Sequence, residues 1–316
     1  MAIITATDLS LHRRGVQVLT NASFSANPGE ITGVLGPRGS GKSSLIHIMA
    51  GLLAPSSGSA VVNDFDILDS PERVRASVGV MFQEVFIDDF LTARRVLDLH
   101  GRLQGLSGSM RARRIESLLS QLGLAEKGNV PVRYFTLFKK RKLALARAVI
   151  HSPAVLLMDE PTAGLAPDQC AEFWSTIIKV NAQFKIAVVF ATSSWEECER
   201  LCDRVIVLHQ GRVLAQGTAE NLKEEVGGST VVLHLDRFVP RLVEAVKSLW
   251  FVKDVKASDK IIEITVRLAE LEVDKITKLV NRFPVRILGL NMHKPNLNDV
   301  FYKHAGSFIE DAGVKT

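Results

Sequence analysis

The stretch GPRGSGKS, residues 36–43, decides the fold of this 316-residue chain. It matches the pattern G-x-x-x-x-G-K-[ST] and lies between an apolar run typical of a buried strand (31–36) and a helical stretch, GKSSLIHIMAGLL. Glycines in such a turn let backbone amides approach phosphate oxygens, and the N-terminus of the next helix adds a favourable dipole. The sequence therefore predicts a phosphate-binding loop between a strand and a helix.

Each residue of this loop is a candidate contact to a nucleotide. Lys42 is long enough to reach the β- and γ-phosphates, and the Ser43 hydroxyl can ligate Mg²⁺. The predicted nucleotide-binding residues are Gly36, Pro37, Arg38, Gly39, Ser40, Gly41, Lys42, Ser43 and Ser44.

A second stretch, AVLLMDEP (154–161), completes the predicted site. A buried strand that ends in Asp159 and Glu160 delivers two carboxylates to the carboxyl edge of a parallel sheet, where ligands bind in open α/β folds. We expect Asp159 to hold Mg²⁺ and Glu160 to orient or deprotonate the attacking water. The alternative, that the two acids only cap the next helix, is less favoured beside a phosphate loop. Because the chain has no N-K-x-D motif for reading guanine, adenine or a non-discriminating site is favoured over a GTPase, and the expected cofactors are ATP and Mg²⁺.

Strand-like and helix-like segments alternate through the first domain, which we place at 1–226. Strands are expected at 31–36, 154–159, 186–192 and 204–211. This alternation predicts an α/β layer with a mostly parallel sheet. Between about residues 86 and 150 the pattern becomes helical, so we expect a helical subdomain to be inserted there. The arginines of RARR (111–114) are interpreted as a solvated helix face.

The sequence changes in character at Gly227 and Gly228, which mark a domain boundary. The segment 229–316 reads in the order strand, helix, two strands, helix, strand, followed by a last helix. This βαββαβ order predicts a small C-terminal α+β domain of the ferredoxin-like, split βαβ type.

The composition restricts the classes of function. A net charge of +5 suits a polyanionic ligand or an anionic membrane surface, but it is too small to indicate nucleic-acid binding. The opening residues lack the pattern of a signal peptide, and no apolar run approaches the roughly 18–20 residues of a spanning helix. We therefore expect a cytoplasmic protein whose membrane role requires another subunit.

Three cysteines indicate a reducing compartment, because they are odd in number and include no CxxC pair. They are Cys170, Cys198 and Cys202. Cys198 and Cys202 stand four residues apart in a helical stretch, where a metal site is one reading. Buried packing is the favoured reading, since thiols behave as small apolar groups.

The motifs in their order resemble the ATP-binding-cassette (ABC) ATPases, a branch of the P-loop NTPases, over residues 3–223. The resemblance rests on GPRGSGKS, then Gln83 in VMFQE, KKRKLALARAVI, LLMDEPTAGLAP and EECERLCDRV. Within that superfamily, LTARRVLDLHGRLQGL and KPNLNDVFYKHAG resemble the antibiotic- and multidrug-exporter ATPases of the daunorubicin-resistance type. The resemblance implies that Gln83 joins the Mg²⁺ shell and the catalytic site.

The resemblance also implies that two cassettes enclose two ATP molecules, each between one phosphate loop and the LSGGQ-like signature of the other cassette. That signature falls on Phe135, Thr136, Leu137, Phe138 and Lys139. Thr136 keeps a hydroxyl for the γ-phosphate, but Leu137 and Phe138 replace the glycines that let a helix N-terminus approach the nucleotide. We expect the Phe138 ring to hold the partner's phosphate away.

Three further positions depart from the family pattern. Ser193 stands where the family has a switch histidine, which gives the catalytic site a shorter, uncharged group. Ala166 replaces the aspartate of the Gly-Leu-Asp-Pro loop and removes an N-cap side chain before Pro167. The aromatic residue that stacks on adenine falls near Arg13 or Arg14, and a guanidinium covers less of the base.

These patterns predict the ATP-binding subunit of an exporter, with weak or partner-dependent ATPase activity. The expected partners are a membrane permease, which would hold the chain on the inner face of the cell membrane, and a second cassette with a more complete signature. A homodimer would place two defective signatures over both nucleotides. The alternative is a degenerate, regulatory cassette with little hydrolysis. A cassette protein of DNA repair or translation is disfavoured, because coiled-coil insertion, zinc-type cysteines and a tandem cassette are missing.

Overall fold

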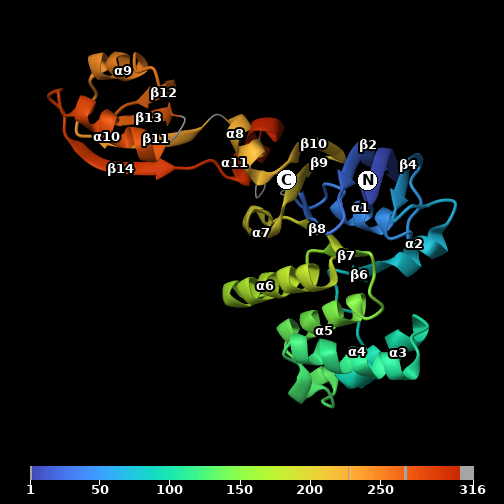
Figure 1. The fold of residues 1–316 in the computed structure, drawn as a ribbon. Coiled ribbons are helices and arrows are strands. Elements are labelled where there is room, and N and C mark those ends of the chain that lie inside the picture. Colours follow the sequence, from blue (N-terminus) through green and yellow to red (C-terminus); the bar gives the residue numbers. More distant parts are fainter. Residues whose placement is uncertain (1, 227, 267–268, 307–316) are drawn as a thin grey trace. The chain divides into compact units, whose positions relative to one another are not determined.

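The computed structural model describes residues 2–226, 228–266 and 269–306, and these residues form two compact units that divide after Thr218 (Figure 1). The helix Ala219–Val226 (α8) lies in the second unit, whereas the predicted boundary at Gly227 placed it in the first. The reason is local packing. Helix α8 contacts the last helix, Leu297–Ala305 (α11), and the Lys303 ammonium donates to the Glu225 carbonyl.

A six-stranded sheet forms the centre of the first unit, in the order β10-β9-β3-β8-β7-β6. Its strands are β3 Ile31–Leu35, β6 Val78–Met81, β7 Val155–Asp159, β8 Ala187–Thr192, β9 Arg204–His209 and β10 Arg212–Gly217. All neighbours pair in parallel except β9 and β10. The predicted α/β layer with a mostly parallel sheet is confirmed. The carboxyl ends of β3, β7 and β8 therefore meet at one edge, which is where the predicted site residues lie.

A second, antiparallel sheet was not predicted. It has the order β2-β1-β4-β5, with β1 Ile4–Arg13, β2 Val16–Ala26, β4 Ser57–Val62 and β5 Phe65–Asp66. The helix Lys42–Met49 (α1) belongs to one core with residues of both sheets, and it contacts β4, β7 and β8. Its side chains Leu45, Ile46, Ile48 and Met49 are fully buried. This packing fixes the helix that follows the phosphate loop.

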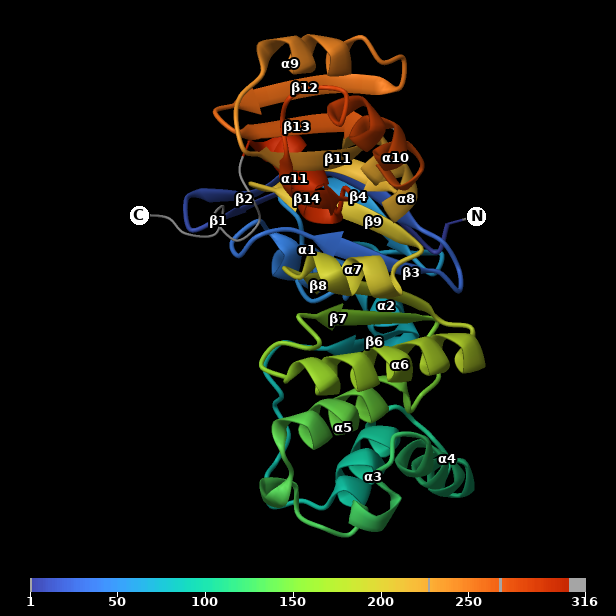
Figure 2. The ribbon, with the colours of Figure 1, turned by 90° about the vertical axis from the view of Figure 1, so that its left-hand side faces the viewer.

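A helical subdomain lies between β6 and β7 in the sequence, as predicted. It contains α3 Ala93–Leu103, α4 Gly108–Gln121, α5 Leu137–Val149 and two 3₁₀ turns, Ala125–Lys127 and Val132–Tyr134. Figure 2 shows α3, α4 and α5 gathered beyond the β6 edge of the central sheet. The other helices of this unit are α2 Pro71–Ser77, α6 Pro167–Phe184 and α7 Trp195–Leu201. Helix α5 contacts β6, so its position is linked to the sheet.

The second unit contains a four-stranded antiparallel sheet in the order β12-β13-β11-β14. Its elements are β11 Ser229–Leu235, α9 Pro240–Lys247, β12 Val252–Ser258, β13 Ile261–Val266, α10 Ala269–Val280 and β14 Ile287–His293. This order is that of a ferredoxin-like split βαβ domain. Alternate residues of β11, such as Val231 and Leu233, are fully buried in the hydrophobic core of the second unit. In the part of the chain that the structure describes, no helix has the length and hydropathy needed to span a membrane.

Candidate nucleotide site

A cavity of about 670 Å³ opens at the carboxyl edge of the central sheet. Three loops surround it: the phosphate loop after β3, the loop after β7 and the loop after β8. The lining residues are Val18, Arg38, Gly39, Gly41, Lys42, Ser43, Ser44, Gln83, Glu160, Thr162, Ala163, Gly164, Thr192, Ser193 and Ser194. The structure therefore brings together most of the side chains that the sequence analysis singled out.

Two glycines of the phosphate loop have clear steric reasons. A Cβ on Gly36 would lie 2.1 Å from the Leu208 carbonyl oxygen, so no larger residue fits between β3 and β9. Gly41 has φ 105°, a conformation that side chains strongly disfavour. The loop is also held from outside, since the Gly211 amide donates to the Ser40 carbonyl at 2.9 Å. These contacts present the loop to the cavity in one conformation.

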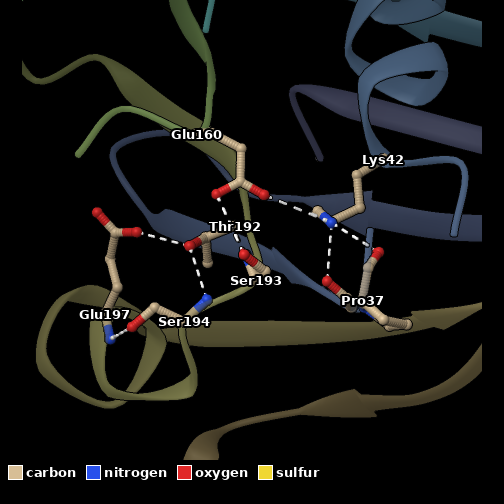
Figure 3. A network of polar contacts seen from close by, with 8 residues as sticks. Pro37, Lys42, Glu160, Thr192, Ser193, Ser194 and Glu197 are labelled. Atoms are coloured by element: carbon tan, nitrogen blue, oxygen red, sulfur yellow. Dashed lines mark hydrogen bonds and ion pairs between the residues drawn. The ribbon is translucent and has the colours of Figure 1, made fainter. Parts of the chain in front are cut away.

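Lys42 is the cation of the site. Only 5% of its side chain is exposed, and its ammonium donates to the carbonyls of Gly36 at 2.7 Å and Pro37 at 2.9 Å (Figure 3). It also lies 3.5 Å from a Glu160 carboxylate oxygen. Burial lowers the pKa of Lys42, although the charges of Glu160 and Asp159 oppose this shift. Because Lys42 has a flexible stem and several donors, its ammonium can turn from these carbonyls toward a phosphate.

The residues expected around Mg²⁺ fit a hard divalent cation. Asp159 ends β7, is 4% exposed, and its Oδ1 atom has no hydrogen-bond partner among the residues that the structure describes. Leaving a buried carboxylate oxygen unpaired is unfavourable, and an ion at this position would remove that penalty. Ser43 and Gln83 line the cavity and supply the neutral oxygen ligands that Mg²⁺ accepts.

Glu160 directs its carboxylate across the cavity toward Ser193. Its backbone has φ 44°, and its amide donates to the Ala191 carbonyl at 2.8 Å, so the main chain turns sharply where β7 ends. The Ser193 amide donates to Glu160 Oε2 at 3.3 Å, and the Ser193 hydroxyl lies 3.5 Å from the same atom. Such strained backbone is common at functional sites. Two of the three predicted catalytic residues, Glu160 and Ser193, are thus adjacent but only weakly bonded.

Sequence reasoning missed Glu197, Thr162 and Thr192. Glu197 lies on α7 and is 1% exposed, and its carboxylate accepts hydrogen bonds from both threonines. The stretch Ser194-Trp195-Glu196-Glu197 matches a capping box, S-x-x-E, which was the signal available in the sequence.

Arg141 links the signature helix to the site. It lies on α5, is 3% exposed, and donates to the Ala163 carbonyl at 3.0 Å and to the Phe82 carbonyl at 3.3 Å. Ala163 lines the cavity, and Phe82 directly precedes Gln83, which also lines it. The position of α5 is therefore coupled to two walls of the cavity.

The predicted base-stacking residue is placed elsewhere. Arg13 ends β1 in the hairpin with β2, is exposed, and does not line the cavity, whereas Val18 of β2 does. Arg14 is also exposed in that hairpin and has φ 50°. The apolar contact to a base on this strand would therefore come from Val18.

The signature residues differ in detail from the expectation. Thr136 is the N-cap of α5, and its hydroxyl accepts from the Lys139 amide at 3.4 Å. The Phe138 ring does not project freely, because it is half-buried with the Lys142 ammonium 4.5 Å from its centroid. Leu137 is 42% exposed and packs beside Gly164. The bulk at the helix N-terminus is therefore supplied by Leu137 more than by Phe138.

The remaining departure from the family pattern, Ala166, lies at the start of a helix. Ala166 is the N-cap of α6 and has no polar side chain to accept from the amides of the first turn, while its own amide donates to the Gln169 side chain at 3.5 Å. Cys198 and Cys202 pack against β3, where a Cβ on Gly33 would lie within 2.8 Å of both sulfur atoms. Those thiols fill space behind the sheet and do not face the cavity.

Comparisons with known proteins agree with this geometry. The family model described as "ABC transporter" matches residues 19–163. The daunorubicin resistance ATP-binding protein DrrA2 of Streptomyces coeruleorubidus is 31% identical over 95% of this chain and 94% of that protein. The linearmycin resistance ATP-binding protein LnrL of Bacillus subtilis is 29% identical over 93% of this chain and 95% of that protein.

Solved structures give the same result for the cassette. The ATP-binding subunit of an ABC transporter superposes with a TM-score of 0.65 at 27% identity, covering 71% of this chain and 93% of that one. CbiO1 of Clostridium perfringens, part of the transporter complex cbiONQ, gives a TM-score of 0.64 at 25% identity over 72% of this chain and 94% of that one.

Proposed function

Because this chain belongs to the ATP-binding proteins of ABC transporters, we propose that it binds Mg-ATP in the cavity described above and couples that binding to export through a separate membrane permease. The observation that supports this best is that Lys42, Ser43, Gln83 and Glu160 line one cavity at the phosphate loop, where the charge of Asp159 also acts on Lys42. Relatives named for resistance to daunorubicin and linearmycin suggest that the cargo is a toxic, antibiotic-like small molecule.

In this proposal the loop amides and Lys42 hold the phosphates. Ser43, Gln83 and Asp159 would hold Mg²⁺, which would supply positive charge against the charge that develops on the transferred phosphoryl group. Glu160 orients the attacking water and accepts its proton, because its carboxylate lies at the end of β7 and faces the Ser193 side of the cavity. At the position where the family has the switch histidine, the Ser193 hydroxyl is the hydrogen-bond donor. Because Ser193 carries no charge, we expect ATP hydrolysis at this site to be slow.

We propose that the chain works with a second, more complete cassette. Leu137 stands 42% exposed at the N-terminus of α5, where a close approach to a partner's phosphate needs a residue without a side chain. In a homodimer both nucleotides would meet this leucine. In a heteromer the nucleotide held by Lys42 would meet the partner's glycines, and one of the two sites would be competent.

A groove of about 410 Å³ offers a surface for the permease. Its lining includes His100 of α3 and Arg147 of α5, together with Phe82 and Phe86, which follow β6, and His151, which follows α5. Phe86 is 69% exposed, so an apolar side chain is available to a partner. Since Phe82 directly precedes Gln83, a segment bound in the groove would lie against the chain that leads to the nucleotide cavity.

The second candidate function is a regulatory cassette that binds ATP with little hydrolysis, and Leu137, Ala166 and Ser193 favour it. The two candidates differ in a measurable way. Co-expression with a candidate permease and a candidate second cassette, followed by purification, gives the complex for a steady-state ATPase assay. The resistance of the cells to the exported drug is measured in parallel. Turnover that is lost in Glu160→Gln supports the first candidate, while full turnover and resistance in that variant would favour the regulatory one.

A further inference from the structure

A buried carboxylate beside the cavity has no part in the proposed chemistry. Glu197 lies on α7 with 1% of its surface exposed. Its Oε1 atom accepts from the Thr162 hydroxyl at 3.0 Å and from the Trp174 indole at 2.9 Å, and its Oε2 atom accepts from the Thr192 hydroxyl at 2.6 Å (the last is drawn in Figure 3). A buried, fully bonded acid at this place calls for a reason beyond packing.

Helix capping does not supply that reason. In a capping box the glutamate at the third helical position accepts from the N-cap amide. Here the amide of the N-cap residue Ser194 donates to the Thr192 hydroxyl at 3.0 Å, and only the other half of the box is formed, from the Glu197 amide to the Ser194 hydroxyl at 3.1 Å. The Glu197 carboxylate is thus free of the helix end and is used elsewhere. Burial raises its pKa, which shows that a charge in this position is unfavourable unless its partners hold it.

Those partners belong to the two loops that carry the reactive groups. Thr162 follows Glu160 after β7, and Thr192 precedes Ser193 at the end of β8. Both threonines line the cavity. One carboxylate therefore joins the loop of the general base to the loop of the hydroxyl that faces it.

The direct contact between those loops is too weak to fix their spacing. Ser193 approaches Glu160 at 3.3 Å through its amide and at 3.5 Å through its hydroxyl, which is at the limit of a hydrogen bond. The bond from Thr192 to Glu197 is 2.6 Å, which is short for a hydroxyl donor, so it is the tighter of the two contacts. Because the Ser193 side chain is short, its own contact with Glu160 does not fix the distance between the two loops. That distance must be set by another residue that joins them.

We infer that Glu197 is a positioning residue for ATP hydrolysis, which acts through Thr162 and Thr192 to set the distance between Glu160 and Ser193. The inference rests on the proposed function. Glu197 touches no substrate in this scheme. It holds the two loops at the separation in which a water can lie between the base and the phosphate.

The test compares Glu197→Gln with a matched control, Glu196→Gln, which removes an exposed acid from the same turn of α7. The amide keeps the size of Glu197 but cannot accept from Thr162, Trp174 and Thr192 at once. In the assembled complex we expect kcat to fall at least tenfold in Glu197→Gln, with KM for ATP changed less than threefold and the thermal midpoint retained. The control is expected to match the unmodified complex. Equal kcat in Glu197→Gln and the control would overturn the inference.

A second readout does not depend on turnover. The indole N–H resonance of Trp174, assigned with Trp174→Phe, reports the Glu197 bond in the full chain. Addition of Mg-ATP is expected to shift it in the unmodified chain and in Glu196→Gln, and not in Glu197→Gln. If the Trp174 resonance of the unmodified chain does not shift when Mg-ATP binds, the inference is also overturned.

Two further arms separate this inference from the proposed function. If Glu197→Gln fails to fold, Thr192→Val tests the 2.6 Å bond in its place, with the same expected loss of kcat and the same refuting result. Failure of the unmodified chain to bind Mg-ATP would remove the proposed function itself, and this inference with it. Binding and hydrolysis that are indifferent to both substitutions would remove the inference alone.

Discussion

Replacing Lys42 by alanine should weaken Mg-ATP binding to the isolated chain about tenfold to thirtyfold. A hydrogen bond to a charged group contributes about 1.5–3 kcal/mol, which corresponds to roughly 10- to 150-fold in Kd. The structure favours the lower part of this range. In the free chain the ammonium already donates to Gly36 at 2.7 Å and Pro37 at 2.9 Å, and it lies 3.5 Å from Glu160. Turning to a phosphate gives up part of those interactions, so the net gain is smaller than the gross contact.

Isothermal titration of the purified chain with Mg-ATP measures this effect. Lys179→Ala is the matched control, because it removes one exposed positive charge from α6 in the same unit and leaves the cavity unchanged. Lys42 is 5% exposed, so a thermal melt must accompany the titration to show that the variant is folded. Unchanged affinity in a folded Lys42→Ala chain, or an equal loss in Lys179→Ala, would refute the assignment of the phosphate site.

Three other substitutions or truncations test the remaining steps. Glu160→Gln should abolish hydrolysis in the complex and leave ATP bound, because an amide cannot accept the proton of the attacking water; hydrolysis at the unmodified rate would show that Glu160 is not the base. Leu137→Gly and Phe138→Gly combined with Ser193→His should raise ATP-dependent self-association and ATPase activity of the isolated chain, measured by light scattering and phosphate release. Each glycine costs about 1 kcal/mol of helix stability, so a melt is needed, and a folded chain without gain would favour the regulatory cassette. Deleting 219–316, which removes the second unit together with its helix α8, should reduce assembly with the partners and leave Mg-ATP affinity unchanged; loss of ATP binding with assembly intact would contradict the expectation that this segment folds separately.

The sequence predicted those parts of the molecule whose determinants are local. The phosphate loop, the acids that end β7 and the strand order of the second unit each depend on a short pattern of glycines, charges or alternating apolar residues. The antiparallel sheet of the first unit has a weaker pattern. Its strand β1 has irregular pairing with β2 between Ala6 and Leu9 and again between Leu9 and Leu11, and these bulges break the alternation on which strand prediction relies.

The missed site residues have a different physical cause. Glu197 gains its importance from Thr162 and Trp174, which are 35 and 23 residues away in the chain and meet it only in the folded unit. Val18 lines the cavity because β2 passes above the phosphate loop, and nothing in its own neighbourhood marks it. Phe138 was expected to hold a partner's phosphate away, but the sequence did not indicate that the ammonium of Lys142, one helical turn later, lies over its ring. Sequence patterns do not reveal contacts between distant elements or the directions of side chains within a helix.

The burial of α1 between two sheets has a kinetic consequence. Leu45, Ile46, Ile48 and Met49 have no exposed surface, so this helix can leave its place only when both sheets separate. Local unfolding of the first unit therefore leaves α1 in place and occurs in segments with fewer buried contacts. The phosphate cradle at its N-terminus is then already formed whenever a nucleotide arrives, and association requires no slow refolding step. Exchange of ADP for ATP on this chain would be governed by how fast the old nucleotide departs, and the empty interval between the two would be brief.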